Sequence, residues 1–365
     1  MERKKVLIAS DSFKGTLSSL EIGRIIKNNL NKKGYDADYI AVSDGGEGFL
    51  DAIENSLKSL KRIYHQAYDA FFKPNYASFL YDENKKTAYF ELAEVVGLPK
   101  EKNKLDPYHA STYGLGYLIN YAIHNYTINN IYIGIGGSAS NDGGSGLLEA
   151  LGLKFYDENH HLIDHLCNDK LALIKEIDNQ ALINNIKNIK FTVLTDVTNP
   201  LLGEQGATYV YARQKGANDH DLIILENNLL HFKKMTIDYL KKDCSLEKGS
   251  GAAGGSGFGI MSYLDSDFTT GIDFIIEKTN LQVLINHYDM VITGEGRFDN
   301  QSLYGKLIAG IRKLNPKELI IICGSKEDLA LVNHKVYAIV PTITNLEESL
   351  KMPKEALNKL LDYYF

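Results

Sequence analysis

Cysteine is scarce in this chain. Only Cys167, Cys244 and Cys323 occur among its 365 residues, they lie far apart, and none forms a CxxC pair. An odd number of isolated cysteines indicates neither a disulfide framework nor a zinc site. We therefore expect all three to be small buried side chains.

Long apolar runs and basic runs are missing as well. No stretch is long enough to span a bilayer, and the apolar run near the start ends at Asp11, which favours a first strand over a signal peptide. The formal net charge is −6, and no basic run could supply phosphate contacts along a duplex. We expect a cytoplasmic protein with no nucleic-acid or membrane partner.

Several catalytic signatures are absent too. The chain has no GxxxxGK[ST] P-loop, no HRD or DFG kinase motif, no HExxH pair and no GxSxG elbow. Neither glycine-rich stretch combines an intact GxGxxG with a following acidic residue at a strand end, so a dinucleotide site lacks support. An NAD-dependent dehydrogenase therefore ranks low among the possible functions.

The pattern that is present begins with strands and helices in alternation. Apolar runs at 6–9 and 39–42 each end in a polar loop, and amphipathic helices at 18–31 and 49–57 follow them. This order predicts a parallel, doubly wound sheet. The closing part of the chain repeats it. Further strands are expected at 289–293, 319–322 and 336–340.

The middle of the chain has a different pattern. Strands at 63–70, 77–81 and 87–92, with a turn between the last two, indicate an antiparallel meander and a second domain. The sequence predicts an α/β fold in which residues 1–61 and 284–365 form a discontinuous, five-stranded flavodoxin-like domain. Residues 62–283 would form an inserted α/β domain.

A glycine-rich stretch at 131–152 is the most informative single segment. An apolar strand, 131–135, leads into the loop 136–144 and then into a helix with Leu147, Leu148 and Leu151 on one face. A strand, a glycine-rich turn and a helix point backbone N–H groups at an anion. The stretch therefore indicates a phosphate or carboxylate site. The alternative is a turn whose glycines only let backbones pack closely.

Polar, glycine-containing loops of this kind occur six times, mostly at strand ends, where ligands bind in parallel sheets. They span 11–15, 44–48, 136–144, 196–199, 251–257 and 294–301. Phosphoryl transfer needs carboxylates for hydrated Mg²⁺, cations and N–H groups for the charged oxygens, and a base for the hydroxyl. For any single charge, a solvated loop position or a helix cap is the alternative, and Asp11 and Asp299 are candidate caps.

Nine segments, taken together and in order, resemble those of the bacterial type 1 glycerate kinase family, the glyoxylate-pathway kind. They are IASDSFKGTLSSLE, SDGGEGFLDA, FELAEVVGLP, STYGLG, IGIGGSASNDGGSGLLEALG, TDVTNPLLGEQGATYVY, QKGA, GSGAAGGSGFG and VITGEGRFDNQSLYGK. Two departures are Arg213, where the family commonly has a proline, and Phe49, where it usually has a small polar residue. Neither removes a glycine or a carboxylate.

The resemblance implies a kinase that uses ATP and Mg²⁺ to phosphorylate a hydroxyl of D-glycerate, with 2-phospho-D-glycerate as the product. It also implies that the inserted domain is similar to a restriction-endonuclease core. The active site would lie in the cleft between the domains, which we expect to close on ligand binding. The phosphorylated hydroxyl and the oligomeric state, a homodimer included, are not determined by the sequence.

Roles follow from residue type and loop position. Asp44 is the expected base or metal-organising carboxylate, with Asp196 as its rival, and these two are the candidate metal ligands. Lys14, Arg297 and Lys306 would neutralise phosphate or carboxylate charge, and Lys14 and Lys306 are expected to be catalytic together with Asp44 and Asp196. The candidates for substrate or phosphate binding are Asp11, Ser12, Gly45, Glu47, Gly136, Gly137, Ser138, Asn141, Asp142, Asn199, Lys215, Gly254, Glu295, Arg297 and Asp299.

Two other functions stay open. One is a kinase of another small hydroxy acid or sugar acid. The other is a non-catalytic binding protein of the periplasmic-receptor kind, against which the absence of a signal peptide counts.

Overall fold

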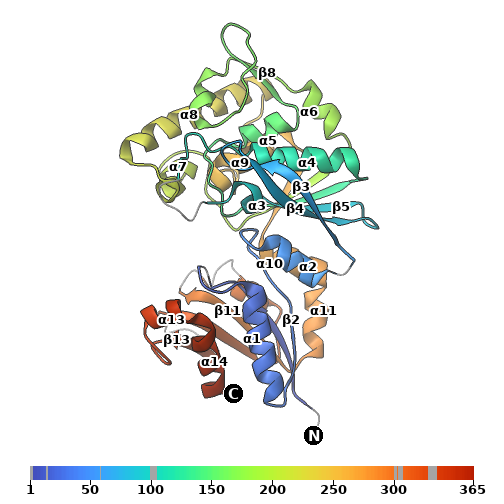
Figure 1. Cartoon of the computed structure of the whole chain (residues 1–365), viewed down its shortest axis with the longest axis vertical. Helices are drawn as coiled ribbons and strands as arrows, with labels where there is room; N and C mark the ends of the chain where they lie inside the picture. Colours follow the sequence, from blue (N-terminus) through green and yellow to red (C-terminus); the bar gives the residue numbers. More distant parts are fainter. Residues whose placement is uncertain are drawn as a thin grey trace. The chain divides into compact units, whose positions relative to one another are not determined.

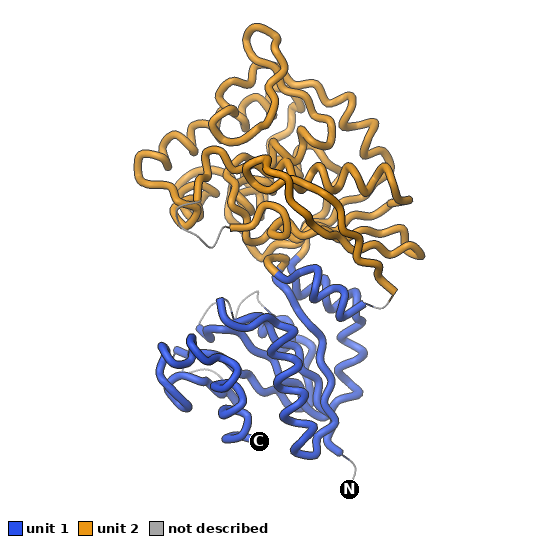
Figure 2. Tube along the Cα trace, viewed as in Figure 1, with its two compact units in different colours: residues 1–44, 48–58, 270–365 blue, residues 45–47, 59–269 orange. Residues whose placement is uncertain are grey.

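The chain forms two compact units in the computed structural model (Figure 2). Unit 1 consists of Met1–Asp44, Gly48–Lys58 and Thr270–Phe365, and unit 2 of Gly45–Glu47 and Ser59–Thr269. The structure describes residues 3–13, 15–57, 59–98, 105–299, 302, 307–327 and 335–365. The α/β class with parallel sheets is confirmed. The expected domain limits, and the endonuclease-like character of the insert, stay predictions.

Unit 1 contains a five-stranded sheet in the order β13-β12-β11-β1-β2, and every neighbouring pair is parallel. Renumbered along unit 1 alone, this is the order 2-1-3-4-5, which is the flavodoxin-like order. The strands are β1 Lys5–Ser10, β2 Asp36–Tyr39, β11 Met290–Phe298, β12 Leu319–Lys326 and β13 Lys335–Val340. The helices of eight or more residues are α1 Ser19–Lys32, α2 Phe49–Ser56, α10 Gly271–Thr279 and α14 Pro353–Tyr364, and the shorter ones are α11 Leu281–Leu284, η4 Ile285–His287, α12 Leu307–Lys313 and α13 Leu346–Lys351.

Helices α1 and α14 lie side by side in unit 1 (Figure 1). Their apolar faces pack on the strand residues Val6 and Ile8, which are fully buried. Helix α1 begins at Ser18, whose hydroxyl accepts a hydrogen bond from the Glu21 N–H, while the Glu21 carboxylate accepts one from the Ser18 N–H. This reciprocal capping box shows that Asp11, a candidate cap in the sequence, does not cap the helix.

Three strands in unit 1 differ from the expected limits by several residues. Strand β11 runs to Phe298 instead of ending at 293, β12 runs to Lys326 instead of 322, and β2 spans Asp36–Tyr39 instead of 39–42. Strand β11 lies between two partners, and its pairing with β12 continues through Glu295 and Arg297, so ladder hydrogen bonds extend it. Glu295 and Arg297 therefore lie on a strand and not in a loop.

Unit 2 is built on a six-stranded sheet in the order β10-β9-β6-β5-β4-β3. Strands β5, β6, β9 and β10 are mutually parallel, whereas β3, β4 and β5 form the expected antiparallel meander. The strands of this sheet are β3 Lys61–Tyr68, β4 Pro74–Asp82, β5 Thr87–Glu91, β6 Asn130–Gly134, β9 Lys190–Leu194 and β10 Ser266–Thr269. A separate two-stranded antiparallel sheet consists of β7 Lys154–Tyr156 and β8 Glu176–Asp178.

The helices of unit 2 surround a large apolar core that includes Phe79, Phe90 and Phe191. They are α3 Leu92–Val96, α4 Tyr113–Asn125, α5 Ser145–Ala150, η2 Asn168–Leu173, α6 Gln180–Asn185, α7 Ala207–Tyr211, η3 Arg213–Lys215, α8 Asp219–Leu240 and α9 Ala252–Tyr263. Across the described ranges, no helix combines the length and the apolar character that crossing a membrane requires.

Candidate functional site

Three of the predicted loops meet at one edge of the sheet in unit 2. Strands β6 and β9 are parallel neighbours, so the glycine-rich loop after β6 and the loop with Asp196 after β9 begin at the same edge. The segment Gly45–Glu47 joins them, because the Gly136 N–H donates to the Gly45 carbonyl at 2.9 Å. A Cβ on Gly45 would lie 2.5 Å from the Leu194 carbonyl oxygen, so only glycine fits there.

The glycine-rich loop, residues 136–144, is hydrogen-bonded to the end of α3 and to the segment that follows this helix. The Ala139 N–H donates to the Val96 carbonyl at 2.9 Å, and the Leu98 N–H donates to the Gly137 carbonyl at 3.1 Å. Gly137 is exposed and left-handed, with φ at +76°. The N–H groups of Gly137 and Ser138 donate to no group in the described part of the chain. They are therefore available to an anion.

Asp142 shapes this loop from inside. Its side chain is fully buried, and its two oxygens accept four hydrogen bonds, from the Thr112 N–H and hydroxyl and from the Gly144 and Gly146 N–H groups. Burial raises the pKa of the Asp142 carboxyl, while the four hydrogen bonds favour its ionised form. The structure thus gives Asp142 a part in holding the loop, and its direct contact with substrate stays a prediction.

Lys215 lies beneath the same loop with only 3% of its surface exposed. Its Nζ donates to the Ser138 Oγ at 2.9 Å and to the Ser140 carbonyl oxygen at 2.6 Å. Burial lowers the pKa of the Lys215 amine to about 7, although the charge of Asp142 acts in the opposite direction. Through these two hydrogen bonds, the buried amine holds Ser138 and Ser140 of the glycine-rich loop in place.

The second glycine-rich turn, at the start of α9, packs directly against the first. Ala253, Gly254 and Gly255 are all left-handed, and the Gly143 N–H donates to the Gly254 carbonyl at 3.0 Å. A Cβ on Gly254 would lie 2.1 Å from the Ser140 carbonyl oxygen. The predicted candidate Gly254 therefore lets two loops approach closely.

Gly254→Ala is expected to destabilise the folded protein by about 3 kcal/mol or more, because it combines left-handed strain of about 1–2 kcal/mol with a backbone clash. Gly203→Ala is the matched control. Gly203 is also left-handed, but a Cβ there meets nothing within 4 Å. The loss of stability in Gly203→Ala should therefore come from the backbone strain alone. Urea unfolding of both variants tests this, and equal shifts would contradict the close-approach argument.

Asn199 connects the loop after β9 to its surroundings. Its Nδ2 donates to the Gln205 carbonyl, its Oδ1 accepts from the Tyr211 hydroxyl at 2.8 Å, and its own carbonyl accepts from the Gly251 N–H. Asp196, three residues earlier, is half-buried. The amide of Asn199 therefore fixes the loop that carries Asp196.

Two asparagines outside the glycine-rich loop, Asn168 and Asn228, are hydrogen-bonded in series to its backbone. The Nδ2 of Asn168 donates to the Asn141 carbonyl at 2.7 Å, and the Nδ2 of Asn228 donates to the carbonyl and side-chain oxygens of Asn168. Neither asparagine was a candidate, because neither lies in a motif. Asn228 does carry one signal. It is a polar residue on the buried face of α8, next to Leu225 and Leu229.

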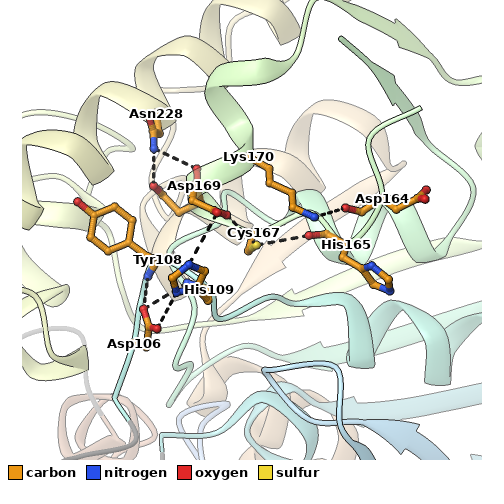
Figure 3. A network of polar contacts seen from close by, with 10 residues as sticks. Asp106, Tyr108, His109, Asp164, His165, Cys167, Asp169, Lys170 and Asn228 are labelled. Carbon is orange, nitrogen blue, oxygen red and sulfur yellow. Dashed lines mark hydrogen bonds and ion pairs between the residues drawn. The ribbon is translucent and has the colours of Figure 1, made fainter. Parts of the chain in front are cut away.

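The same network extends to the protein surface (Figure 3). The Asp106 carboxylate accepts a hydrogen bond from the His109 ring at 2.7 Å, which raises the pKa of His109. His109 also lies 3.8 Å from Asp169, whose carboxylate accepts from the Cys167 thiol at 2.9 Å. Burial raises the pKa of that thiol. All three cysteines are buried and unpaired in disulfides, as expected.

Unit 1 brings together a second group of candidates at the carboxyl ends of β1 and β11. The Asp11 N–H donates to the Gly294 carbonyl at 2.9 Å, and the Asp11 carboxylate accepts from the Ser12 N–H. Glu295 follows on β11 and is half-buried. These three predicted residues, Asp11, Ser12 and Glu295, therefore lie at one edge of the sheet.

The remaining candidates of unit 1 are more dispersed. The Arg297 guanidinium is exposed and pairs with Glu327 at 2.6 Å. The Asp299 carboxylate accepts a hydrogen bond from the Ser302 N–H. Asp44 lies against the start of α10, where a Cβ on Gly271 would be 2.8 Å from its Cα. Lys14 and Lys306, two expected catalytic residues, lie outside the described residues.

Comparison with known proteins identifies the family of the chain. The model of the glycerate kinase family matches residues 6–363. The chain is 36% identical to the glycerate 2-kinase of Escherichia coli K12, over 95% of this chain and 93% of that protein. It is 34% identical to a glycerate kinase of Halalkalibacterium halodurans, over 97% of this chain and 95% of that protein.

A solved structure is similar over the same length. It is the crystal structure of a protein assigned as glycerate kinase 2 from Salmonella typhimurium LT2, with a TM-score of 0.80 and 30% identity, over 99% of this chain and 97% of that one. The family match and the near-complete coverage lead to one conclusion: the chain belongs to the glycerate kinase family.

Proposed function

We propose that this protein transfers the γ-phosphoryl group of ATP to a hydroxyl of D-glycerate, with 2-phospho-D-glycerate as the product. The observation that carries the proposal is the meeting of three loops at one sheet edge, in a chain that the family model matches almost from end to end. Those loops offer a carboxylate and two N–H groups, of Gly137 and Ser138, that donate to no described residue. These are the parts that phosphoryl transfer uses.

The residues of unit 2 have separate tasks in this proposal. The N–H groups of Gly137 and Ser138 bind an oxygen anion of phosphate or carboxylate. The left-handed backbone at Gly137 favours glycine, which has no side chain that could obstruct the anion. Asp196 lies half-buried on the neighbouring loop and either takes the proton of the glycerate hydroxyl or organises the metal. Asp44 is its rival for both tasks.

Mg²⁺ is proposed as the metal. Within the described ranges, no three His, Cys, Asp or Glu side chains converge as metal ligands. Mg²⁺ usually keeps several waters and needs only one or two carboxylates besides the substrate phosphates. Asp44 or Asp196 would hold it, and the ion would neutralise charge on the β- and γ-phosphate oxygens. Its test is kinase activity in the presence of a chelator, with and without added Mg²⁺.

The assay for the proposed function couples ADP release to a panel of acids. ADP should be released with D-glycerate, and at least about tenfold more slowly with L-glycerate or lactate. L-glycerate has the opposite configuration at C2, so its hydroxyls cannot all meet the same partners, and lactate lacks the hydroxyl on C3, which leaves the site's partner for that group unpaired. Phosphorus NMR of the product then distinguishes 2-phosphoglycerate from the 3-phospho isomer. Faster turnover of another hydroxy acid would replace glycerate as the substrate. No turnover of any acid in the panel would reject the kinase proposal.

A further inference from the structure

The amine of Lys215 has no direct role in the proposed function, yet it is buried, which is unfavourable for its charged form. Both of its hydrogen-bond acceptors, the Ser138 Oγ and the Ser140 carbonyl oxygen, are neutral. No carboxylate oxygen of the described residues lies within ion-pair distance of its Nζ. Burying an ammonium group without such a partner is unfavourable, so the neutral amine is favoured in the free protein.

Asp142 is the ionisable group whose charge acts on Lys215. Its two oxygens are already occupied by hydrogen bonds from Thr112, Gly144 and Gly146. It therefore offsets the burial of Lys215 only in part, and the pKa of the amine remains at about 7. Close by in the chain, the Ser140 Oγ and the Asn141 Oδ1 are buried without any partner in the described structure. The polar environment of the amine is thus incomplete.

Ser138 connects this amine to the predicted anion position. Its Oγ accepts from Lys215, while its N–H and that of Gly137 donate to no described group. An anion on those N–H groups would therefore lie one residue from the contact between Ser138 and the amine, which is itself buried. We propose that Lys215 is a positioning residue for the glycine-rich loop and takes up a proton when an anion binds there. This inference rests on the proposed function.

The physical reason is the mutual stabilisation of opposite charges. An anion within a few ångströms favours the charged form of an amine, commonly by 1–3 pKa units. The proton comes from the solvent, and the ammonium group then donates to the same Ser138 and Ser140 oxygens that the amine already contacts. Binding and protonation are linked, so each promotes the other.

Calorimetry of the whole enzyme tests the proton directly. Binding of D-glycerate alone and of ADP alone is measured at pH 6 and pH 8, in buffers with different ionisation enthalpies. For the ligand that binds at the loop, we expect uptake on the order of half a proton or more at pH 8. At pH 6 the uptake should be much smaller, because the amine is then already charged.

Two variants separate this uptake from titration of the ligand itself. Lys215→Met should abolish the difference between pH 8 and pH 6. Lys215→Arg should abolish it as well, because a guanidinium group stays protonated. Lys190→Met is the control, since this lysine lies exposed on β9 and pairs with Asp265, and it should retain the uptake. In turnover assays, Lys215→Met should raise the KM of the ligand bound at the loop more than it lowers kcat.

The free enzyme supplies a measurement that needs no variant. The unfolded chain holds a proton on Lys215 up to pH about 10.5, whereas the folded chain loses it near pH 7. Between these values the unfolded state binds more protons, so stability should rise with pH. We expect the urea midpoint of the transition that includes unit 2 to increase from pH 7 to pH 9 in the wild type, and to increase less in Lys215→Met.

Two results would overturn the inference. One is equal proton uptake at pH 6 and pH 8 for both ligands in the wild type. The other is unchanged uptake in a folded Lys215→Met variant. Either could occur in an enzyme that still phosphorylates D-glycerate, and the proposed function would then stand. Absence of turnover would reject the proposed function instead.

Discussion

Asp196→Asn is expected to lower kcat by about 10³-fold, within the range of 10²–10⁴ that a positioned acid or base contributes. The amide keeps the size of the carboxylate but removes its charge and its ability to accept a proton. Asp196 lies half-buried on the loop after β9, next to the loop in which the Gly137 and Ser138 N–H groups donate to no described residue. Steady-state kinetics with ATP and D-glycerate measure the effect, and KM should change much less than kcat.

The control for this prediction is Asp267→Asn. Asp267 is an exposed carboxylate on β10 that pairs with Lys190 at the surface, so its loss should leave kcat unchanged. Asp44→Asn tests the rival assignment in the same assay. If Asp196→Asn keeps kcat within tenfold of the wild type while Asp44→Asn does not, the base is Asp44. If both variants keep it, neither carboxylate has the proposed role.

Asp142→Ala is expected to reduce the free energy of unfolding by about 3–5 kcal/mol, the range seen when a buried charged partner is removed. The substitution leaves four buried donors, from Thr112, Gly144 and Gly146, without an acceptor. Each unmet donor costs about 1–3 kcal/mol before the structure relaxes. Urea unfolding followed by circular dichroism measures the change.

Glu83→Ala is the matched comparison for Asp142→Ala. Glu83 is a carboxylate in an ion pair with Lys61, and both side chains are largely exposed. Its removal should change the free energy of unfolding far less than Asp142→Ala does, because water screens exposed pairs and replaces their contacts. If the two variants lost similar stability, Asp142 would not hold the loop as described.

Local patterns in the sequence were enough to predict much of the fold. The helices expected at 18–31 and 49–57 are observed as α1 Ser19–Lys32 and α2 Phe49–Ser56, because an amphipathic period acts within one segment. The meander of β3, β4 and β5 was also visible, since a short turn joins the last two strands. The alternation of strands and helices likewise indicated the parallel sheet of unit 1.

Predictions that depended on partners distant in sequence were less accurate. Strand β11 continues through Glu295 and Arg297 because β12 pairs with it there, and that pairing is invisible in either segment alone. Asp11 was considered a cap because of its residue type, whereas Ser18 and Glu21 cap α1. Asn168 and Asn228 were missed because their hydrogen bonds join segments that share no motif.

The sequence by itself determined the α/β class, the glycine-rich loops and the family, because these depend on periodicity and on residue types in order along the chain. Only the tertiary structure decided which loop charges face inward. Asp142 is held by Thr112, 30 residues away, and Lys215 reaches Ser138 across 77 residues. Such contacts between distant segments bury both side chains. Because they are buried, Asp142 and Lys215 support the predicted anion site instead of lying in solvent.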